Sequence, residues 1–288
     1  MRWGGLAAAA MATLAAACGP AGNGNRAGGE GVTIPLDPPS GDRLGPLPAV
    51  TAARGTNPPL VVIDPGHGGR DPGASSTFIE SPEKRVTLAP ARAIRHSLAA
   101  SGRIRVALTR DSDDYLPLEA RYEIARRLGA DLFVSVHADA APLNDQAHGA
   151  TVYTLSEVAS DREAALLAAS ENAAGLIPGA RLSPETNVNL VLIDLAQRES
   201  MDVAARFARL LYREAAPVFP FRPQWHRFAG FIVLKAPDIP SVLFESGYLT
   251  NERDAAYLQS PEGRGQIAEG MRRAIEAHFA ERFRPDGG

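Results

Sequence analysis

Short apolar runs alternate with longer amphipathic segments along most of the chain after residue 59. Runs of about four to eight apolar residues are typical of buried strands, whereas apolar positions spaced three and four residues apart are typical of helices. The pattern predicts strands at 60–64, 104–108, 131–137, 149–155, 231–234 and 241–245. It predicts helices at 84–100, 116–128, 156–174, 195–214 and 265–279, and a loop at 177–189.

This order of strands and helices favours an α/β fold. We expect a mostly parallel central sheet of about six strands, with helices on both faces, in one domain over residues 60–288. The segment 155–198 is longer than a simple connection in such a fold requires. Pro90 lies inside the first predicted helix, so the regular helix is expected to start or to kink there.

The residues before 60 have a different character. Residues 1–17 combine a positive charge, an Ala-rich apolar run and small residues at the end, which is typical of a secretory signal peptide. Residues 18–59 are rich in Gly, Pro and other small residues, and they predict a flexible tether. Cys18 directly follows the predicted cleavage site, where a bacterial lipoprotein carries its lipid. A lipid anchor at Cys18 and plain cleavage both remain open.

Composition and charge narrow the functional classes. Hydrophobic residues make up 45% of the chain and charged residues 22%, which is ordinary for a globular protein. The formal net charge of -3 gives no indication of a nucleic-acid partner. Beyond the N-terminus no apolar stretch is long enough to span a bilayer, and nothing points to an obligate dimer, so a monomer is expected. With a single cysteine in the sequence, neither a disulfide nor a thiol nucleophile is expected.

Four ionisable residues lie where apolar runs end or helices begin. His67 follows the first predicted strand, His137 and Glu245 end two later ones, and Glu83 directly precedes the first predicted helix. Two imidazoles and one carboxylate are the ligand set of catalytic zinc, and a further carboxylate is then needed as general base. Taken singly, each histidine would more often be structural, and Glu83 would more often complement a helix dipole. The combination favours a zinc site.

Three aspartates lie close to these residues in the sequence. Asp64, Asp71 and Asp139 are candidates for holding the ligand imidazoles by hydrogen bonds. Turn formation and helix capping are the alternative roles for each of them.

Five motifs in a fixed order extend this interpretation. They are Val-Ile-Asp-Pro-Gly-His-Gly-Gly-Arg-Asp-Pro-Gly-Ala at 62–74, Glu83-Lys84, Leu-Thr-Arg at 108–110, Ala-Asp-Leu-Phe-Val-Ser-Val-His-Ala-Asp-Ala at 130–140, and Pro-Ser-Val-Leu-Phe-Glu-Ser-Gly-Tyr-Leu-Thr-Asn at 240–251. With them, the chain from Leu60 to about Phe279 resembles the zinc-dependent amidase 3 family of N-acetylmuramoyl-L-alanine amidases. The resemblance implies a zinc amidase catalytic domain over 60–288.

The resemblance also implies an activity and a role for each site residue. One zinc ion would be bound by His67, Glu83 and His137, with Glu245 as the catalytic carboxylate. The substrate would be peptidoglycan, cut between N-acetylmuramic acid and L-alanine during cell-wall remodelling and daughter-cell separation. This chain departs from the family at Glu80, a second carboxylate before the helix, and at Tyr248, where we expected phenylalanine and regard tyrosine as harmless.

The segment 155–198 resembles the insertion of the cell-division amidases of Gram-negative bacteria. In those enzymes an extra helix covers the zinc site until an activator displaces it. The resemblance therefore implies a periplasmic, autoinhibited enzyme whose activator has a degenerate LytM-type peptidase domain. Glu171 is the candidate for the carboxylate that approaches the metal, with Glu163 and Glu185 as alternatives. A surface helix with solvated glutamates is the other interpretation.

Two other functions fit the same residues. A zinc hydrolase of this fold that cuts a different amide, such as a carboxypeptidase, would need the same open metal site and differ only in its pocket. A wall-binding or regulatory protein on an inactive amidase fold is less favoured, because all four ionisable groups are present.

Overall fold

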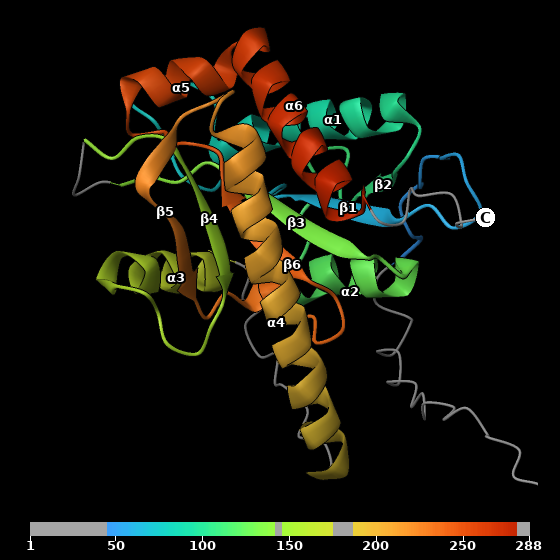
Figure 1. The fold of residues 1–288 in the computed structure, drawn as a ribbon. Coiled ribbons are helices and arrows are strands. Elements are labelled where there is room, and N and C mark those ends of the chain that lie inside the picture. Colours follow the sequence, from blue (N-terminus) through green and yellow to red (C-terminus); the bar gives the residue numbers. More distant parts are fainter. Residues whose placement is uncertain (1–44, 142–145, 175–186, 281–288) are drawn as a thin grey trace, which may run out of the picture. The chain divides into compact units, whose positions relative to one another are not determined.

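A computed structural model describes residues 45–141, 146–174 and 187–280. The predicted signal peptide, Cys18 and Glu185 lie outside these residues, as do the first part of the predicted tether and most of the predicted loop at 177–189. The remainder forms an α/β domain with a central sheet and helices on both faces (Figure 1).

The sheet has six strands in the order β2-β1-β3-β6-β4-β5. All neighbouring strands are parallel except β4 and β6, which are antiparallel. The predicted mostly parallel six-stranded sheet is therefore confirmed. The strands are β1 (Leu60–Pro65), β2 (Arg105–Leu108), β3 (Leu132–His137), β4 (Ala150–Leu155), β5 (Phe221–Ala229) and β6 (Ser241–Glu245).

Helices cover both faces of this sheet. The helix α6 packs against both α1 and α4 over one face, whereas α2 and α3 lie over the other (Figure 1). Within the described residues, no helix combines the length and apolar composition that a membrane span requires. The helices are α1 (Glu83–Ser101), α2 (Leu118–Leu128), α3 (Arg162–Ala174), α4 (Asn187–Ala215), α5 (Glu252–Gln259) and α6 (Pro261–His278), with a short 3-10 helix η1 (Ile232–Leu234).

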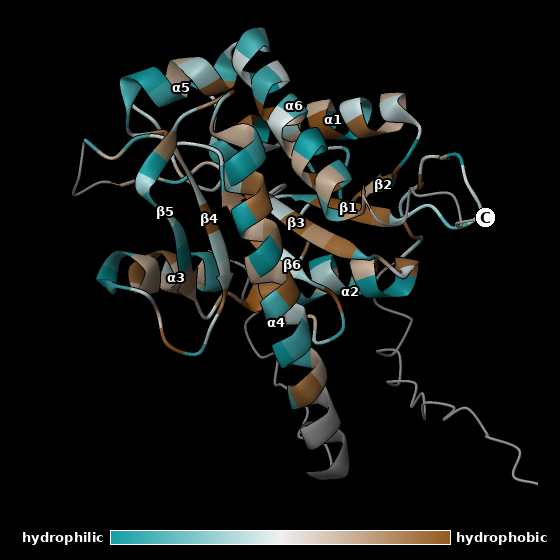
Figure 2. Cartoon of the chain, viewed as in Figure 1, coloured by the Kyte–Doolittle hydropathy of each residue, from teal (hydrophilic) through white to brown (hydrophobic). Residues whose placement is uncertain are grey.

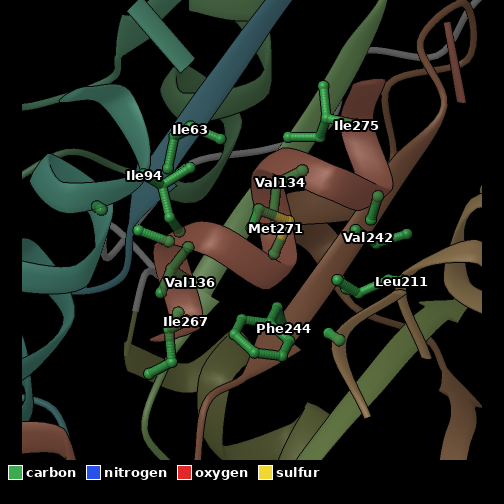
Figure 3. Packing of buried hydrophobic residues seen from close by; sticks show 14 of the residues in the cluster. Ile63, Ile94, Val134, Val136, Leu211, Val242, Phe244, Ile267, Met271 and Ile275 are labelled. Atoms are coloured by element: carbon green, nitrogen blue, oxygen red, sulfur yellow. The ribbon is translucent and has the colours of Figure 1, made fainter. Parts of the chain in front are cut away.

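Alternation along the strands creates two hydrophobic cores. In β1, Val61 and Ile63 pack with α1 and α6, whereas Leu60 and Val62 pack on the opposite face with α2. Figure 2 shows the central strands as the most apolar part of the chain and the helices as two-sided. Figure 3 labels part of the larger core: Ile63, Ile94, Val134, Val136, Leu211, Val242, Phe244, Ile267, Met271 and Ile275.

Several element predictions were wrong. The predicted strand at 231–234 is η1, and the strand β5 precedes it at Phe221–Ala229. Polar residues and Pro223 interrupt β5, which is tolerated because β5 is an edge strand with a register shift against β4. The short helix α5 was missed, and α4 begins at Asn187 instead of 195. The helix α1 runs through Pro90, since buried residues on both sides of the proline hold it in the core.

The domain begins before Leu60. Thr51 exchanges hydrogen bonds with Val106 of β2 through its backbone N–H and its hydroxyl, at 3.0 Å each. The backbone N–H of Arg54 donates to the carbonyl of Gly102 at 2.8 Å. The last part of the segment that we assigned to the tether is therefore attached to the edge of the sheet.

Candidate metal centre

Three of the predicted site residues lie at the carboxyl ends of adjacent strands. His67 follows β1, and His137 and Glu245 are the last residues of β3 and β6. His137 and Glu245 are register partners in the sheet. The chain leaves β1 toward β2 on one side and returns to β3 on the other, so these residues lie at a topological switch point of the sheet. Crevices at such points are where open α/β folds bind ligands.

A strained loop fixes the position of His67. The residue has a φ of 60°, a left-handed conformation that non-glycine residues rarely adopt. Two buried arginines hold this loop: Arg121 donates to the carbonyl of His67 at 2.7 Å, and Arg110 to that of Gly66 at 2.6 Å. A Cβ atom at Gly66 would lie 2.5 Å from the ring of His137, so only glycine allows the two strand ends to approach this closely.

Glu83 lies between the two histidines. One carboxylate oxygen lies 3.0 Å from Nε2 of His67, and the other lies 3.3 Å from Nδ1 of His137. The imidazole centroids are 4.9 Å apart. Glu83 is the first residue of α1, and its carboxylate also accepts the backbone N–H groups of Ala74 and Ala138. The alternative carboxylate, Glu80, is exposed to solvent.

Glu171 of α3 also lies beside the two histidines. Its Oε2 lies 3.6 Å from Nε2 of His67 and 3.5 Å from Nδ1 of His137. The ligand atoms of these three residues all lie within 4.8 Å of one another, an arrangement that could hold a metal ion. Of the alternatives that the sequence left open, Glu163 instead pairs with Arg222 on β5.

The two imidazole nitrogens that face this point are buried and converge among carboxylates. Within the described part of the chain, neither Nε2 of His67 nor Nδ1 of His137 makes a hydrogen bond of good geometry, although oxygens of Glu83 and Glu171 lie 3.0–3.6 Å away. Buried polar atoms are nearly always paired, so two such nitrogens that converge between carboxylates are suited to a cation. Imidazole nitrogens with carboxylate oxygens are a donor set that zinc accepts.

One of the three aspartates contacts a ligand candidate. Oδ2 of Asp71 lies 2.9 Å from Nδ1 of His67, which leaves Nε2 to face the site. Although burial acts in the opposite direction, the hydrogen bond with His67 lowers the pKa of Asp71. Asp64 instead accepts hydrogen bonds from Thr109, Ser135 and Arg121. Among the described residues, no hydrogen bond joins Asp64 or Asp139 to either imidazole, so only Asp71 takes the role for which the three aspartates were candidates.

Glu245 lies in an environment that favours the protonated form of its carboxyl group. It is buried, and neither of its oxygens has a hydrogen-bond partner among the described residues. Burial and the nearby carboxylates of Asp139 and Glu83 raise the pKa of Glu245 well above its usual range. A positive charge between the histidines would oppose this shift.

Sequence analysis assigned no role to the two arginines that hold the His67 loop. Arg110 lies within the Leu-Thr-Arg motif at 108–110, and its place in a family motif could have identified it as a residue that supports the site. Arg121 lies on the same helical face as Leu118 and Ala125, which are buried. A charged residue on the apolar face of an amphipathic helix indicates a buried ion pair, and Arg121 pairs with Asp64 at 3.0 Å.

Comparisons with known proteins identify the family to which the chain belongs. The family model described as N-acetylmuramoyl-L-alanine amidase, Amidase_3, matches residues 61–277. The amidase AmiA of Salmonella typhimurium is 37% identical over 222 residues, covering 76% of this chain and 76% of AmiA. AmiC of Escherichia coli O6:H1 is 34% identical over 225 residues, covering 78% of this chain but 54% of AmiC, so the chain spans about half the length of that relative.

A solved structure shows the same fold. The amidase AmiC2 of Nostoc punctiforme superimposes with a TM-score of 0.56 and 27% identity, over 78% of this chain and 99% of AmiC2. The family match covers all three strand ends at the candidate metal centre. The chain belongs to the Amidase_3 family of N-acetylmuramoyl-L-alanine amidases.

Proposed function

We propose that this protein is a zinc-dependent N-acetylmuramoyl-L-alanine amidase, which hydrolyses the amide between N-acetylmuramic acid and L-alanine in peptidoglycan. The observation that carries the proposal is the convergence of two buried imidazole nitrogens, those of His67 and His137, with Glu83 between them and Glu245 beside them. Family membership supports the choice of this amide over that of a carboxypeptidase.

In this proposal His67, Glu83 and His137 hold one zinc ion. Bound zinc would supply a Lewis acid that polarises the scissile carbonyl and favours loss of a proton from water. Asp71 keeps the imidazole of His67 in the orientation that leaves Nε2 toward the site. The arginines behind the loop keep its backbone in the strained conformation that aims the ring.

Glu245 handles the proton. Its carboxylate takes a proton from the attacking water and delivers it to the leaving amide nitrogen. Its burial beside His137 keeps bulk water away from the carboxylate, and its unpartnered oxygens leave it free to accept the proton.

We also propose that the protein is made in an inhibited state. Glu171 approaches both histidines and so occupies the place that a water or a substrate carbonyl would need. Catalysis then requires α3 to move away, and an activator with a degenerate LytM-type domain is the partner that family resemblance suggests. In the cell we place the enzyme in the periplasm, exported by the segment 1–17 and either released or anchored by a lipid at Cys18. Its role there would be separation of daughter cells.

The catalytic proposal is tested by release of stem peptides from purified peptidoglycan, measured by mass spectrometry. In a chain that carries Glu171→Gln, and so lacks the proposed inhibition, Glu245→Gln should lower the rate roughly 10²- to 10⁴-fold, the contribution typical of a general acid-base group. Its zinc content should stay at that of the wild type, because Glu245 is not a proposed ligand. Glu199→Gln, an exposed glutamate on α4, is the matched control and should behave as wild type. Full activity of Glu245→Gln would refute the assignment.

Inhibition is tested by Glu171→Gln, which removes the charge that faces the histidines. This variant should release stem peptides faster than the wild type in the absence of any activator, while chelation of zinc should abolish the activity of both. Equal rates for wild type and Glu171→Gln would show that Glu171 does not restrain the enzyme. The same Glu199→Gln control accounts for loss of a negative charge.

A further inference from the structure

An arginine and a tyrosine lie at the same edge of the sheet as Glu245. In the antiparallel pair of β4 and β6, Thr151 is opposite Glu245, and in the adjoining pair Ala150 is opposite Phe221. The first residues of β5 and the end of β6 therefore lie at the same edge of the sheet, with β4 between them. Arg222 follows Phe221 there, and its guanidinium donates to the hydroxyl of Tyr248 and lies 5.2 Å from the centre of that ring.

A carboxylate from α3 occupies this arginine. Nη1 of Arg222 donates to Oε1 of Glu163 at 2.6 Å. A second guanidinium, that of Arg227, lies 3.1 Å from the same oxygen and also pairs with Asp161. The carboxylate of Glu163 is thus held between two arginines of β5.

The two sides of this ion pair differ in how firmly they are fixed. The side chain of Arg222 is 11% exposed, whereas that of Glu163 is 41% exposed. Tyr248, which orients Arg222, is fully buried, and its backbone N–H is held by Asp254 at 2.9 Å. The arginine and tyrosine therefore belong to the wall of the domain, while Glu163 is carried by a helix laid upon it.

The helix α3 places the carboxylate of Glu171 beside the two histidines and the carboxylate of Glu163 on Arg222. Glu163 and Glu171 are eight residues apart on α3, a rise of about 12 Å along the helix axis. When α3 leaves the metal centre to admit substrate, Arg222 loses Glu163 at the same time. The guanidinium, still oriented by Tyr248, is then free to pair with an anionic group of the substrate in place of Glu163.

We propose that Arg222 and Tyr248 form a subsite for a carboxylate on the peptide part of the substrate, and that Glu163 fills this subsite in the inhibited state. The inference rests on the proposed amidase function and extends it to substrate recognition. An extended peptide advances about 3.3–3.6 Å per residue, so about 12 Å corresponds to a carboxylate within roughly four residues of the scissile amide. The guanidinium binds it through charge-assisted hydrogen bonds, and the tyrosine hydroxyl orients the guanidinium.

The test uses two soluble muramoyl peptides of the same sequence, one with free peptide carboxylates and one with those groups as carboxamides. All variants are made in the zinc-loaded full chain that carries Glu163→Gln and Glu171→Gln, so that no carboxylate of α3 occupies the subsite or the metal centre. The parent should hydrolyse the free acid with roughly tenfold higher kcat/KM than the carboxamide, mostly through KM, as one lost charged hydrogen bond implies. Adding Arg222→Gln should bring this ratio close to one, and Arg222→Lys should restore part of it.

Two further variants keep the result interpretable. Arg273→Gln removes an exposed guanidinium that pairs with Glu214 on α4, and it should leave the ratio unchanged. Tyr248→Phe removes only a hydroxyl, and it should raise KM several-fold for the free acid alone. A ratio that survives both Arg222→Gln and Tyr248→Phe would overturn the subsite and leave Arg222 as a structural contact of α3.

Failure of the amidase proposal is distinguishable from failure of the subsite. If the parent hydrolyses neither peptide, the proposed function is wrong. The subsite is then tested by measuring peptide binding without hydrolysis. Calorimetry with the free-acid peptide and the parent should show binding that Arg222→Gln weakens about tenfold. Binding of equal strength in both proteins, or no binding to the parent, would overturn the subsite.

Discussion

At the scale of single residues, the chemistry of the site is set by buried charged groups that lie 3.0–3.6 Å from one another. Burial alone would lower the pKa of His67, but the carboxylates of Glu83 and Asp71 outweigh it and raise the pKa to about 11. The metal-free protein therefore carries a protonated His67 at neutral pH. A metal ligand must be deprotonated, so zinc and this proton compete for Nε2.

We expect zinc binding to release at least one proton per ion between pH 6 and pH 8. Zinc affinity should rise about tenfold per pH unit for each proton released, because this range lies below the raised pKa of His67. Calorimetry in buffers of different ionisation enthalpy measures the proton count. Asp71→Asn removes one of the groups that raise this pKa, so it should lower the number released at pH 8. A binding enthalpy that does not depend on the buffer would contradict the prediction.

At the scale of elements, α3 is the piece whose position controls the site. Its N-terminal part is held by the ion pairs of Glu163, and its C-terminal part by Asn172. The side chain of Asn172 donates to the carbonyl of Gly230 and accepts the backbone N–H of Ile232, at 2.9 and 2.8 Å. These two bonds lie one residue beyond Glu171, so they fix the end of the helix that reaches the metal centre.

Asn172→Ala should loosen this end of α3 and raise the basal rate of stem-peptide release. Loss of two hydrogen bonds at a mostly buried position weakens the inhibited arrangement by about 1–3 kcal/mol, which corresponds to roughly 5- to 150-fold in its population. The rise should disappear in the Glu171→Gln background, where the helix end no longer restrains the site. A basal rate equal to that of the wild type would show that Asn172 does not hold the inhibited state.

At the scale of the whole molecule, Arg121 joins the helix layer to the strand ends that carry the site. It pairs with Asp64, and the two side chains are 3% and 0% exposed. The same guanidinium donates to the carbonyls of Pro65 and His67. Removal of one member of such a pair leaves a buried charge without a partner.

Arg121→Ala should therefore lower the free energy of unfolding by about 3–5 kcal/mol, measured by urea denaturation of the metal-free protein. Arg127→Ala on the same helix is the matched control. Arg127 is exposed to solvent, so this loss should cost about 0.5 kcal/mol or less. If the two substitutions lowered the free energy of unfolding equally, the buried pair of Arg121 and Asp64 would contribute no more to stability than an exposed arginine.

Much of the fold was predictable because its signals are local. The strands β1, β3 and β6 are short apolar runs bounded by polar residues, and buried strands must look like this in any context. The edge strand β5 has no such signature, since one face is exposed and Arg222, Pro223 and Arg227 interrupt it. Its strand geometry comes from pairing with β4, which is a long-range contact.

The sequence by itself determined where the apolar runs of the central strands lie along the chain. It also determined that His67 follows one of these runs and that His137 and Glu245 end two others. Parallel neighbours in a sheet bring such ends together, so the site followed from the pattern and from family resemblance. Only the tertiary structure decided that Glu171 rather than Glu163 faces the histidines, and that Arg222 and Tyr248 receive Glu163. These contacts depend on how α3 lies across the sheet, and the helical pattern of α3 does not encode its direction.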